Sequence, residues 1–77
     1  MAAPQKRKLS YKESKELEQL PARIEALEAM VASLTDALGD PSFYARDAGA
    51  ITAHNAQLAA AQAELDAAYA RWAELDA

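Results

Sequence analysis

The sequence predicts an all-α protein, an antiparallel two-helix coiled-coil hairpin with a proline kink near the start of the first helix. Two stretches carry apolar residues at alternating spacings of three and four, which is the repeat of a coiled-coil seam. Only about eight residues connect them, and so short a connection makes two helices antiparallel neighbours. With 77 residues, the chain is expected to form one domain.

The first helix is expected over about residues 10–38. Ser10 and Glu13 have the spacing of a capping box, in which each side chain accepts a hydrogen bond from the other residue's backbone N–H. The apolar face of this helix is a single stripe made of Leu17, Leu20, Ile24, Leu27, Val31, Leu34 and Leu38. Charged residues and alanines occupy the other faces, so the stripe needs a partner helix.

Pro21 interrupts this helix locally. It lacks the N–H group that would bond Leu17, and it disfavours the helical conformation at Leu20. Two outcomes remain open: a short helix from Tyr11 to Leu20 followed by a second helix that begins at Pro21, or one long kinked helix. The apolar stripe keeps its phase across the proline, which favours the kinked helix.

Residues 39–47 are expected to form the tip of the hairpin. Gly39 is predicted to be a left-handed cap at the end of the first helix. Asp40 followed by Pro41 then favours the start of one tight helical turn. Asp47 is the expected N-cap of the second long helix.

The second helix is expected over about residues 48–76. Its best stripe again alternates spacings of three and four and consists of Ile51, His54, Leu58, Ala61, Leu65, Ala68, Trp72 and Leu75. A competing stripe through Asn55, Gln62 and Tyr69 would place two amides in the seam and is therefore less favourable. Residues that face each other across the hairpin should have numbers that sum to about 89.

Aromatic side chains are expected at both ends of the core. Phe43 or Tyr44 should close the core at the tip, and Tyr11 should pack against Trp72 where the chain enters and leaves the hairpin. His54 is expected at the edge of the seam, near Asp36, as a structural residue.

The composition excludes several classes of chemistry. There is no cysteine and only one histidine, so thiolate and histidine-cluster metal sites are absent. Gly39 and Gly49 are the only glycines, and neither is followed by the lysine of a phosphate-binding loop. We therefore expect no enzymatic activity, no cofactor and no metal in this chain. No stretch is apolar and long enough for a membrane span or signal peptide, which predicts a soluble, cytoplasmic protein.

Charge is distributed unevenly along the chain. Residues 1–15 carry five cations against Glu13 alone, a net charge of +4, whereas residues 16–77 carry three arginines against eleven acids, a net charge of −8. Residues 1–8 read as a flexible basic arm or the end of a linker, and residues 9–77 as the hairpin. The basic segment predicts contact with a polyanion, and its candidate residues are Lys6, Arg7, Lys8, Lys12 and Lys15, with Arg46 at the tip as a second contact point.

Several short motifs resemble the C-terminal coiled-coil domain of Uup-type ABC-F ATP-binding cassette ATPases. They are Lys8-Leu9-Ser10-Tyr11-Lys12-Glu13, Leu20-Pro21, Asp40-Pro41 with Phe43-Tyr44, and Arg71-Trp72 with Glu74-Leu75. In that family the domain follows two ATP-binding cassettes, forms a helical hairpin and is associated with DNA binding or with nucleic-acid and ribosome work. The resemblance implies an accessory C-terminal domain, with ATP hydrolysis confined to the cassettes of the parent protein.

Two interpretations of function follow. The first is weak, salt-dependent binding of DNA or structured RNA, including ribosomal RNA, through the basic entry segment. The alternative is a protein-interaction domain that docks on the parent cassettes or self-associates as a homodimer, using exposed side chains such as Tyr69 and Met30. Neither interpretation involves a membrane.

Overall fold

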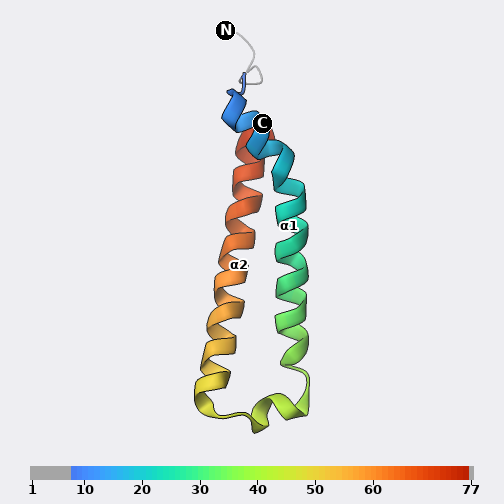
Figure 1. Cartoon of the computed structure of the whole chain (residues 1–77), viewed down its shortest axis with the longest axis vertical. Helices are drawn as coiled ribbons and strands as arrows, with labels where there is room; N and C mark the ends of the chain where they lie inside the picture. The colour runs from blue at the N-terminus through green and yellow to red at the C-terminus, as the bar shows by residue number, and fades with distance from the viewer. Residues whose placement is uncertain (1–7, 77) are drawn as a thin grey trace.

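The structure is a computed structural model that describes residues 8–76. It contains a long helix α1 (Tyr11–Ala37), a short 3₁₀ helix η1 (Pro41–Ala45) and a second long helix α2 (Ala48–Asp76). The two long helices lie side by side in opposite directions and are joined through η1 at the tip (Figure 1). The molecule is a rod of 61 × 22 × 18 Å. The predicted antiparallel helical hairpin is therefore confirmed.

We call the end of the rod opposite the tip the open end, because α1 begins and α2 finishes there (Figure 1). The basic arm predicted for residues 1–8 lies outside the described residues, except for Lys8.

The start of α1 is fixed by its first residues. The Ser10 hydroxyl accepts a hydrogen bond from the Glu13 backbone N–H at 3.1 Å, and the Glu13 carboxylate accepts one from the Ser10 N–H at 3.0 Å. The predicted capping box is thus present, and it satisfies two N–H groups at the helix start that have no partner within the helix.

Helix α1 continues through Pro21 without a break. The alternative of two separate helices is therefore wrong, and the single helix is confirmed. The segment before the proline leans across the C-terminal end of α2 instead of following the axis of the rest of α1 (Figure 1). A change of direction is expected there, because the proline removes one backbone hydrogen bond and crowds the preceding turn.

The end of α1 differs from the expectation. Within residues 8–76 no glycine has a positive φ, so the predicted left-handed cap at Gly39 is wrong. Instead, the N–H groups of Leu38, Gly39 and Asp40 each donate to the carbonyl three residues earlier, at 3.0–3.2 Å. The helix closes by tightening into 3₁₀-type bonds, which bind the last carbonyls without a left-handed residue.

Two aspartates set the geometry of the tip, as the sequence predicts. The Asp40 carboxylate accepts a hydrogen bond from the Ser42 N–H at 2.9 Å at the start of η1. Hydrogen bonding to Ser42 holds the pKa of Asp40 below its ordinary value. The Asp47 carboxylate accepts from the Ala50 N–H at 2.8 Å at the start of α2. Each cap gives a partner to a backbone N–H that the helix itself leaves unbonded.

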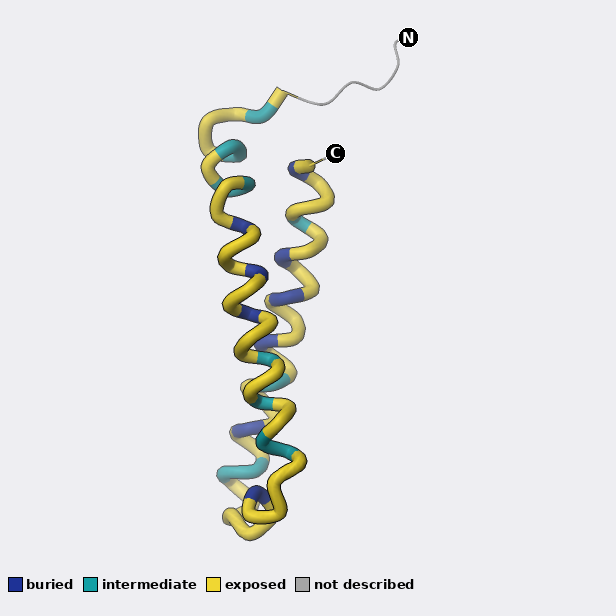
Figure 2. The backbone as a smooth tube through the Cα atoms, turned by 90° about the vertical axis from the view of Figure 1, so that its right-hand side faces the viewer, coloured by how far each residue is buried: buried dark blue, intermediate teal, exposed yellow. Residues whose placement is uncertain are grey.

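The buried residues follow the facing sides of the two helices (Figure 2). Both predicted stripes are confirmed in their central parts. The buried apolar residues are Leu20, Ile24, Leu27, Phe43, Ala61, Leu65, Ala68 and Leu75, and Leu9, Leu17 and Val31 pack partly against the main cluster.

The tip end of the core is closed by Phe43 and His54. Phe43 is buried, and its ring centroid lies 4.8 Å from that of the His54 imidazole. The His54 Nε2 lies 2.8 Å from the carbonyl oxygen of Leu34. Because a carbonyl oxygen can only accept, the Nε2–H group donates this hydrogen bond. The histidine is structural, as predicted, but its partner is this carbonyl and not Asp36.

The predicted aromatic contact at the open end is wrong. Tyr11 is 77% exposed and Trp72 is 37% exposed, so the two rings do not form a closed plug. In a rod of two helices, each helix packs against only one other helix, so the interface is narrow. A side chain as large as tryptophan extends beyond it. Leu75 is buried at this end instead.

Candidate nucleic-acid interface

The basic side chains of the described residues fall into two groups. Arg23 bonds Glu64 across the hairpin at 3.1 Å, and Arg71 bonds Glu16 and Glu74. Within residues 8–76, no ion pair engages the other four: Lys8, Lys12, Lys15 and Arg46. These four are all exposed, and they include every candidate that the sequence predicts within the described part of the chain.

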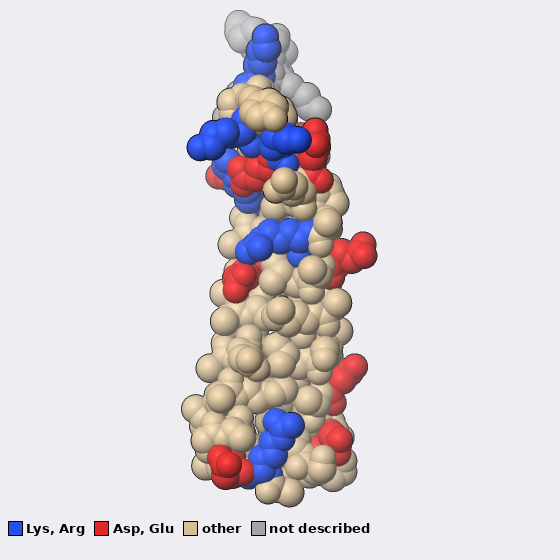
Figure 3. Space-filling view, viewed as in Figure 1, with Lys and Arg blue, Asp and Glu red and all other residues tan. Residues whose placement is uncertain are grey.

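Three of these cations are close in sequence at the open end. Lys8 precedes the Ser10 cap, and Lys12 and Lys15 lie in the first turns of α1. Lys and Arg side chains gather toward the open end in the space-filling view (Figure 3). The Lys15 Nζ lies 5.9 Å from the ring centroid of Tyr11, within range of a cation–π contact. We call Lys8, Lys12 and Lys15 the lysine cluster; Lys6 and Arg7, also predicted here, lie outside the described residues.

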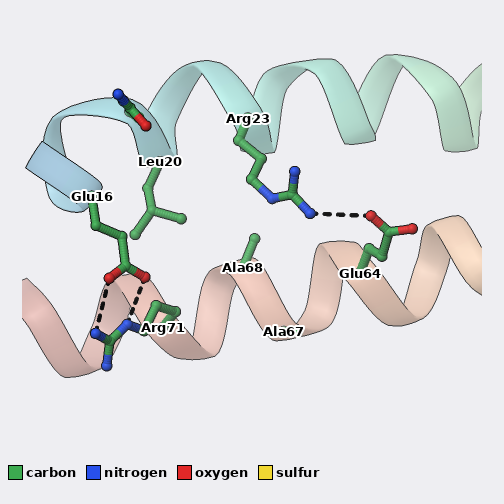
Figure 4. A pocket seen from close by; sticks show the side chains of 8 residues that line it. Glu16, Leu20, Arg23, Glu64, Ala67, Ala68 and Arg71 are labelled. Carbon is green, nitrogen blue, oxygen red and sulfur yellow. Dashed lines mark hydrogen bonds and ion pairs between the residues drawn. The ribbon is translucent and has the colours of Figure 1, made fainter.

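Two acidic residues in the same segment already have partners. Glu13 completes the capping box with Ser10. Glu16 binds the Arg71 guanidinium through both of its oxygens, at 2.6 and 2.9 Å (Figure 4). Glu16 is neutralised by Arg71, and Glu13 contributes one negative charge against three lysines, so the balance of charge in this segment stays positive.

Arg71 joins the segment before Pro21 to α2. Its guanidinium bonds Glu16 in the two-pronged geometry that favours arginine over lysine, and it also donates to Glu74 at 3.0 Å. The hydrogen bond from Arg71 lowers the pKa of Glu16 below its ordinary value of 4.5, and the same bonds raise the pKa of Arg71. This contact fixes where the lysine cluster lies relative to the rest of the rod.

We expect Arg71→Ala to destabilise the domain at neutral pH and to shift the pKa of Glu16 upward. Since folding depresses this pKa, the contact contributes stability above the unfolded-state pKa and loses it as the pH falls through the folded-state pKa. Thermal unfolding curves of the variant and the wild type should therefore converge toward acid pH. The double variant Glu16→Arg with Arg71→Glu restores the pair and should recover stability at pH 7; equal losses in single and double variants would contradict this role.

Arg46 lies at the tip, away from the lysine cluster. Its guanidinium carbon lies 5.6 Å from the ring centroid of Phe43, and the neighbouring Tyr44 is 64% exposed. The two sets of candidate residues are at opposite ends of a rod 61 Å long. The structure therefore does not bring Arg46 into one surface with the lysines.

The sequence interpretation missed the ion pairs that cross the hairpin. Arg71 with Glu16, and Arg23 with Glu64, join residues whose numbers sum to 87, and His54 with Leu34 gives 88, close to the predicted 89. A sum of 89 would instead place Arg23 opposite Asp66 and Glu16 opposite Ala73, so the shift of two residues hid both pairs. A fourth contact, from the Tyr69 hydroxyl to the Glu28 carboxylate, runs diagonally between two long side chains and raises the pKa of Tyr69.

Shallow hollows lie on the surface of residues 8–76, and two of them span both helices. One, of about 260 Å³, lies between the two cross-helix ion pairs and is lined by Glu16, Gln19, Leu20, Arg23, Glu64, Ala67, Ala68 and Arg71 (Figure 4). Its two arginines are already neutralised by its two glutamates. The other, of about 350 Å³, is lined by Met30, Leu34, Gln57, Ala60, Ala61 and Glu64.

In residues 8–76 no three His, Cys, Asp or Glu side chains come together as a metal site would require. In the same residues, neither helix combines the length and apolar character of a membrane span.

Comparisons with known proteins agree with this fold. The sequence profile of the ABC transporter C-terminal domain family matches residues 8–77. Two proteins of Haemophilus influenzae, an ATP-binding protein Uup-like and an ATP-binding protein Uup, are each 42% identical to the chain over 73 residues, or 95% of it. The ATP-binding protein Uup of Escherichia coli (strain K12) is 43% identical over 70 residues, or 91% of the chain. The chain spans only 11–16% of the length of these relatives.

A solved structure resembles the hairpin as well. It is the C-terminal domain of the Uup protein, described as a DNA-binding coiled-coil motif. The two structures superpose with a TM-score of 0.82 at 41% sequence identity, covering 88% of this chain and 80% of the other.

Proposed function

Because this chain belongs to the ABC transporter C-terminal domain family, we propose that it is the accessory DNA-binding domain of a longer, soluble ABC-F type ATPase that works in the cytoplasm. ATP hydrolysis then resides in the ATP-binding cassettes of that longer protein. The likeness to a coiled coil described as DNA-binding supports this proposal.

The observation that carries the proposal is the group of free cations at the open end. In the described residues, Lys8, Lys12 and Lys15 make no ion pair, whereas Arg23 and Arg71 are bound to carboxylates. Free ammonium groups can replace the counterions of DNA phosphates, which is the main source of sequence-independent affinity. Paired guanidinium groups must first give up a carboxylate and contribute less.

The binding mode is electrostatic positioning by one end of the rod. Residues 16–77 carry a net charge of −8, so a duplex lying along the rod would be repelled. Lys6 and Arg7 extend the cluster in sequence and bring the number of phosphate partners to between three and five. Binding of this kind has dissociation constants of roughly 10⁻⁴ to 10⁻⁶ M at physiological salt.

A titration tests the proposal. A labelled DNA duplex is titrated with the 77-residue chain at 50 and 200 mM salt, and binding is followed by fluorescence anisotropy. For a complex with three phosphate contacts, raising the salt from 50 to 200 mM should weaken binding about 40-fold. Each contact contributes about 0.9 to the slope of log K against log salt. No saturable binding at about 100 µM protein in 50 mM salt would reject it. Structured RNA of equal charge serves as competitor, and competition equal to that of DNA would show that the site recognises phosphates and not DNA in particular.

A second candidate function is docking on the ATP-binding cassettes of the longer protein. Met30, 51% exposed beside the 350 Å³ hollow, favours it. This function predicts that the chain co-sediments with the separated cassettes. Met30→Glu should abolish the co-sedimentation, and neutralisation of the lysine cluster should leave it intact; that result would support docking over DNA binding. A mass that rises with concentration in the chain alone would instead indicate a homodimer.

A further inference from the structure

Tyr11 is the most exposed large apolar side chain of the described residues. It is 77% exposed, compared with 64% for Tyr44 and 51% for Met30. It occupies the first position of α1, one residue after the capping serine, and so leaves the buried stripe to later residues of the helix. No packing requirement explains an aromatic ring at this position.

The surroundings of this ring are those of a nucleic-acid contact. Lys12 is its neighbour in sequence, and the Lys15 ammonium lies 5.9 Å from the ring centroid, near one face. With the side chain 77% exposed, the ring remains open to a planar group. The first two carboxylates of α1 in sequence, Glu13 and Glu16, are bonded in the capping box and to Arg71.

We propose that Tyr11 is a stacking site for an unpaired base, so that this domain prefers single-stranded DNA to duplex DNA. The inference rests on the proposed DNA-binding function and adds to it the class of DNA that the site takes. An aromatic ring between cations provides a stacking surface for a base while the lysines bind the flanking phosphates. In a duplex the bases are paired and stacked on one another, so only the phosphate contacts remain.

The expected size of the effect comes from measured base–aromatic stacking. Removing one such ring typically costs 1–3 kcal/mol, equivalent to a loss of about 5- to 150-fold in affinity. Tyr11→Ala should therefore weaken binding of a single strand about 5-fold or more, with duplex affinity changed less than about 2-fold. Tyr11→Phe keeps the ring and should bind like the wild type.

The experiment measures anisotropy of a labelled single strand and of a duplex with the same number of phosphates, at 100 mM salt. Tyr44→Ala is the matched control, because that tyrosine is also highly exposed and lies near a free cation, Arg46, but at the other end of the rod. A strand with one 2-aminopurine reports stacking directly, since its fluorescence falls when the base lies on a ring, and this quenching should vanish in Tyr11→Ala.

The possible results separate this inference from the proposed function. Binding of the single strand that weakens in Tyr11→Ala and recovers in Tyr11→Phe supports the stacking site. The stacking site is overturned if the chain binds the duplex and the single strand with equal, salt-sensitive affinity and if Tyr11→Ala changes neither affinity. That result leaves DNA binding intact. Absence of binding to either DNA overturns both. Circular dichroism of each variant verifies that the hairpin is folded.

Discussion

Replacing Lys8, Lys12 and Lys15 together with glutamine should weaken DNA binding roughly 100-fold at 0.15 M salt. These three ammonium groups are exposed and without ion pairs in the described residues. Each phosphate contact contributes about 0.9 to the slope of log K against log salt. Removal of three contacts should therefore also lower the magnitude of this slope by about 2.7, which a salt titration of anisotropy measures.

The matched control for this variant is Arg23→Gln. It removes one positive charge from the same helix, but from a guanidinium that is already bonded to Glu64. Its salt slope should remain that of the wild type. A slope that falls by the same amount per charge in both variants would mean that net charge, and not the lysine cluster, controls binding.

The length of the DNA separates the cluster from the second predicted contact point. A duplex of about 10 base pairs is ~34 Å long, shorter than the 61 Å rod, and cannot reach both ends. Arg46→Gln should therefore have no effect on such a duplex bound at the lysine cluster. A loss comparable with that of the triple variant would place the interface at the tip.

Leu27→Ala should destabilise the hairpin by about 3 kcal/mol, within the 2–5 kcal/mol usual for a buried leucine. Leu27 is only 6% exposed and lies in the main buried cluster of the core. The register in which facing residues have numbers that sum to about 89 pairs it with the small Ala61 on α2, and an alanine there cannot extend to fill the space that the leucine leaves. The removed side chain therefore costs both its burial and a cavity.

The effect should be large relative to the total stability. A single core in a chain of this size rarely supplies more than about 3–5 kcal/mol, so the variant should be close to unfolded at room temperature. A loss of 3 kcal/mol corresponds to a fall in Tm of about 12–24 °C for a domain of this length. Circular dichroism at 222 nm as a function of temperature measures this fall.

Met30→Ala is the matched control on the same helix. Met30 lies three residues after Leu27 but is 51% exposed, so its loss should change stability by less than about 1 kcal/mol. Equal effects in the two variants would mean that the seam of α1 does not run through Leu27.

The sequence by itself determined the features that depend on neighbouring residues. The capping box of Ser10 and Glu13, the caps at Asp40 and Asp47, and the apolar stripes follow from side chains within a few residues of one another. A cap that bonds the nearby backbone, or an apolar repeat of 3.5 residues, depends only on residues close in sequence. Both can be predicted without knowing where the partner helix lies. The antiparallel pairing then follows from the short connection.

Only the tertiary structure decided which side chains meet across the hairpin and which remain exposed. The bond of Arg71 to Glu16 depends on how the segment before Pro21 leans over α2, and that direction is set by packing and not by periodicity. The same geometry leaves Tyr11 in solvent, where local pattern predicted a contact with Trp72. Contacts between residues about 55 positions apart depend on the angle of a kink, and small changes in that angle move side chains by several ångströms.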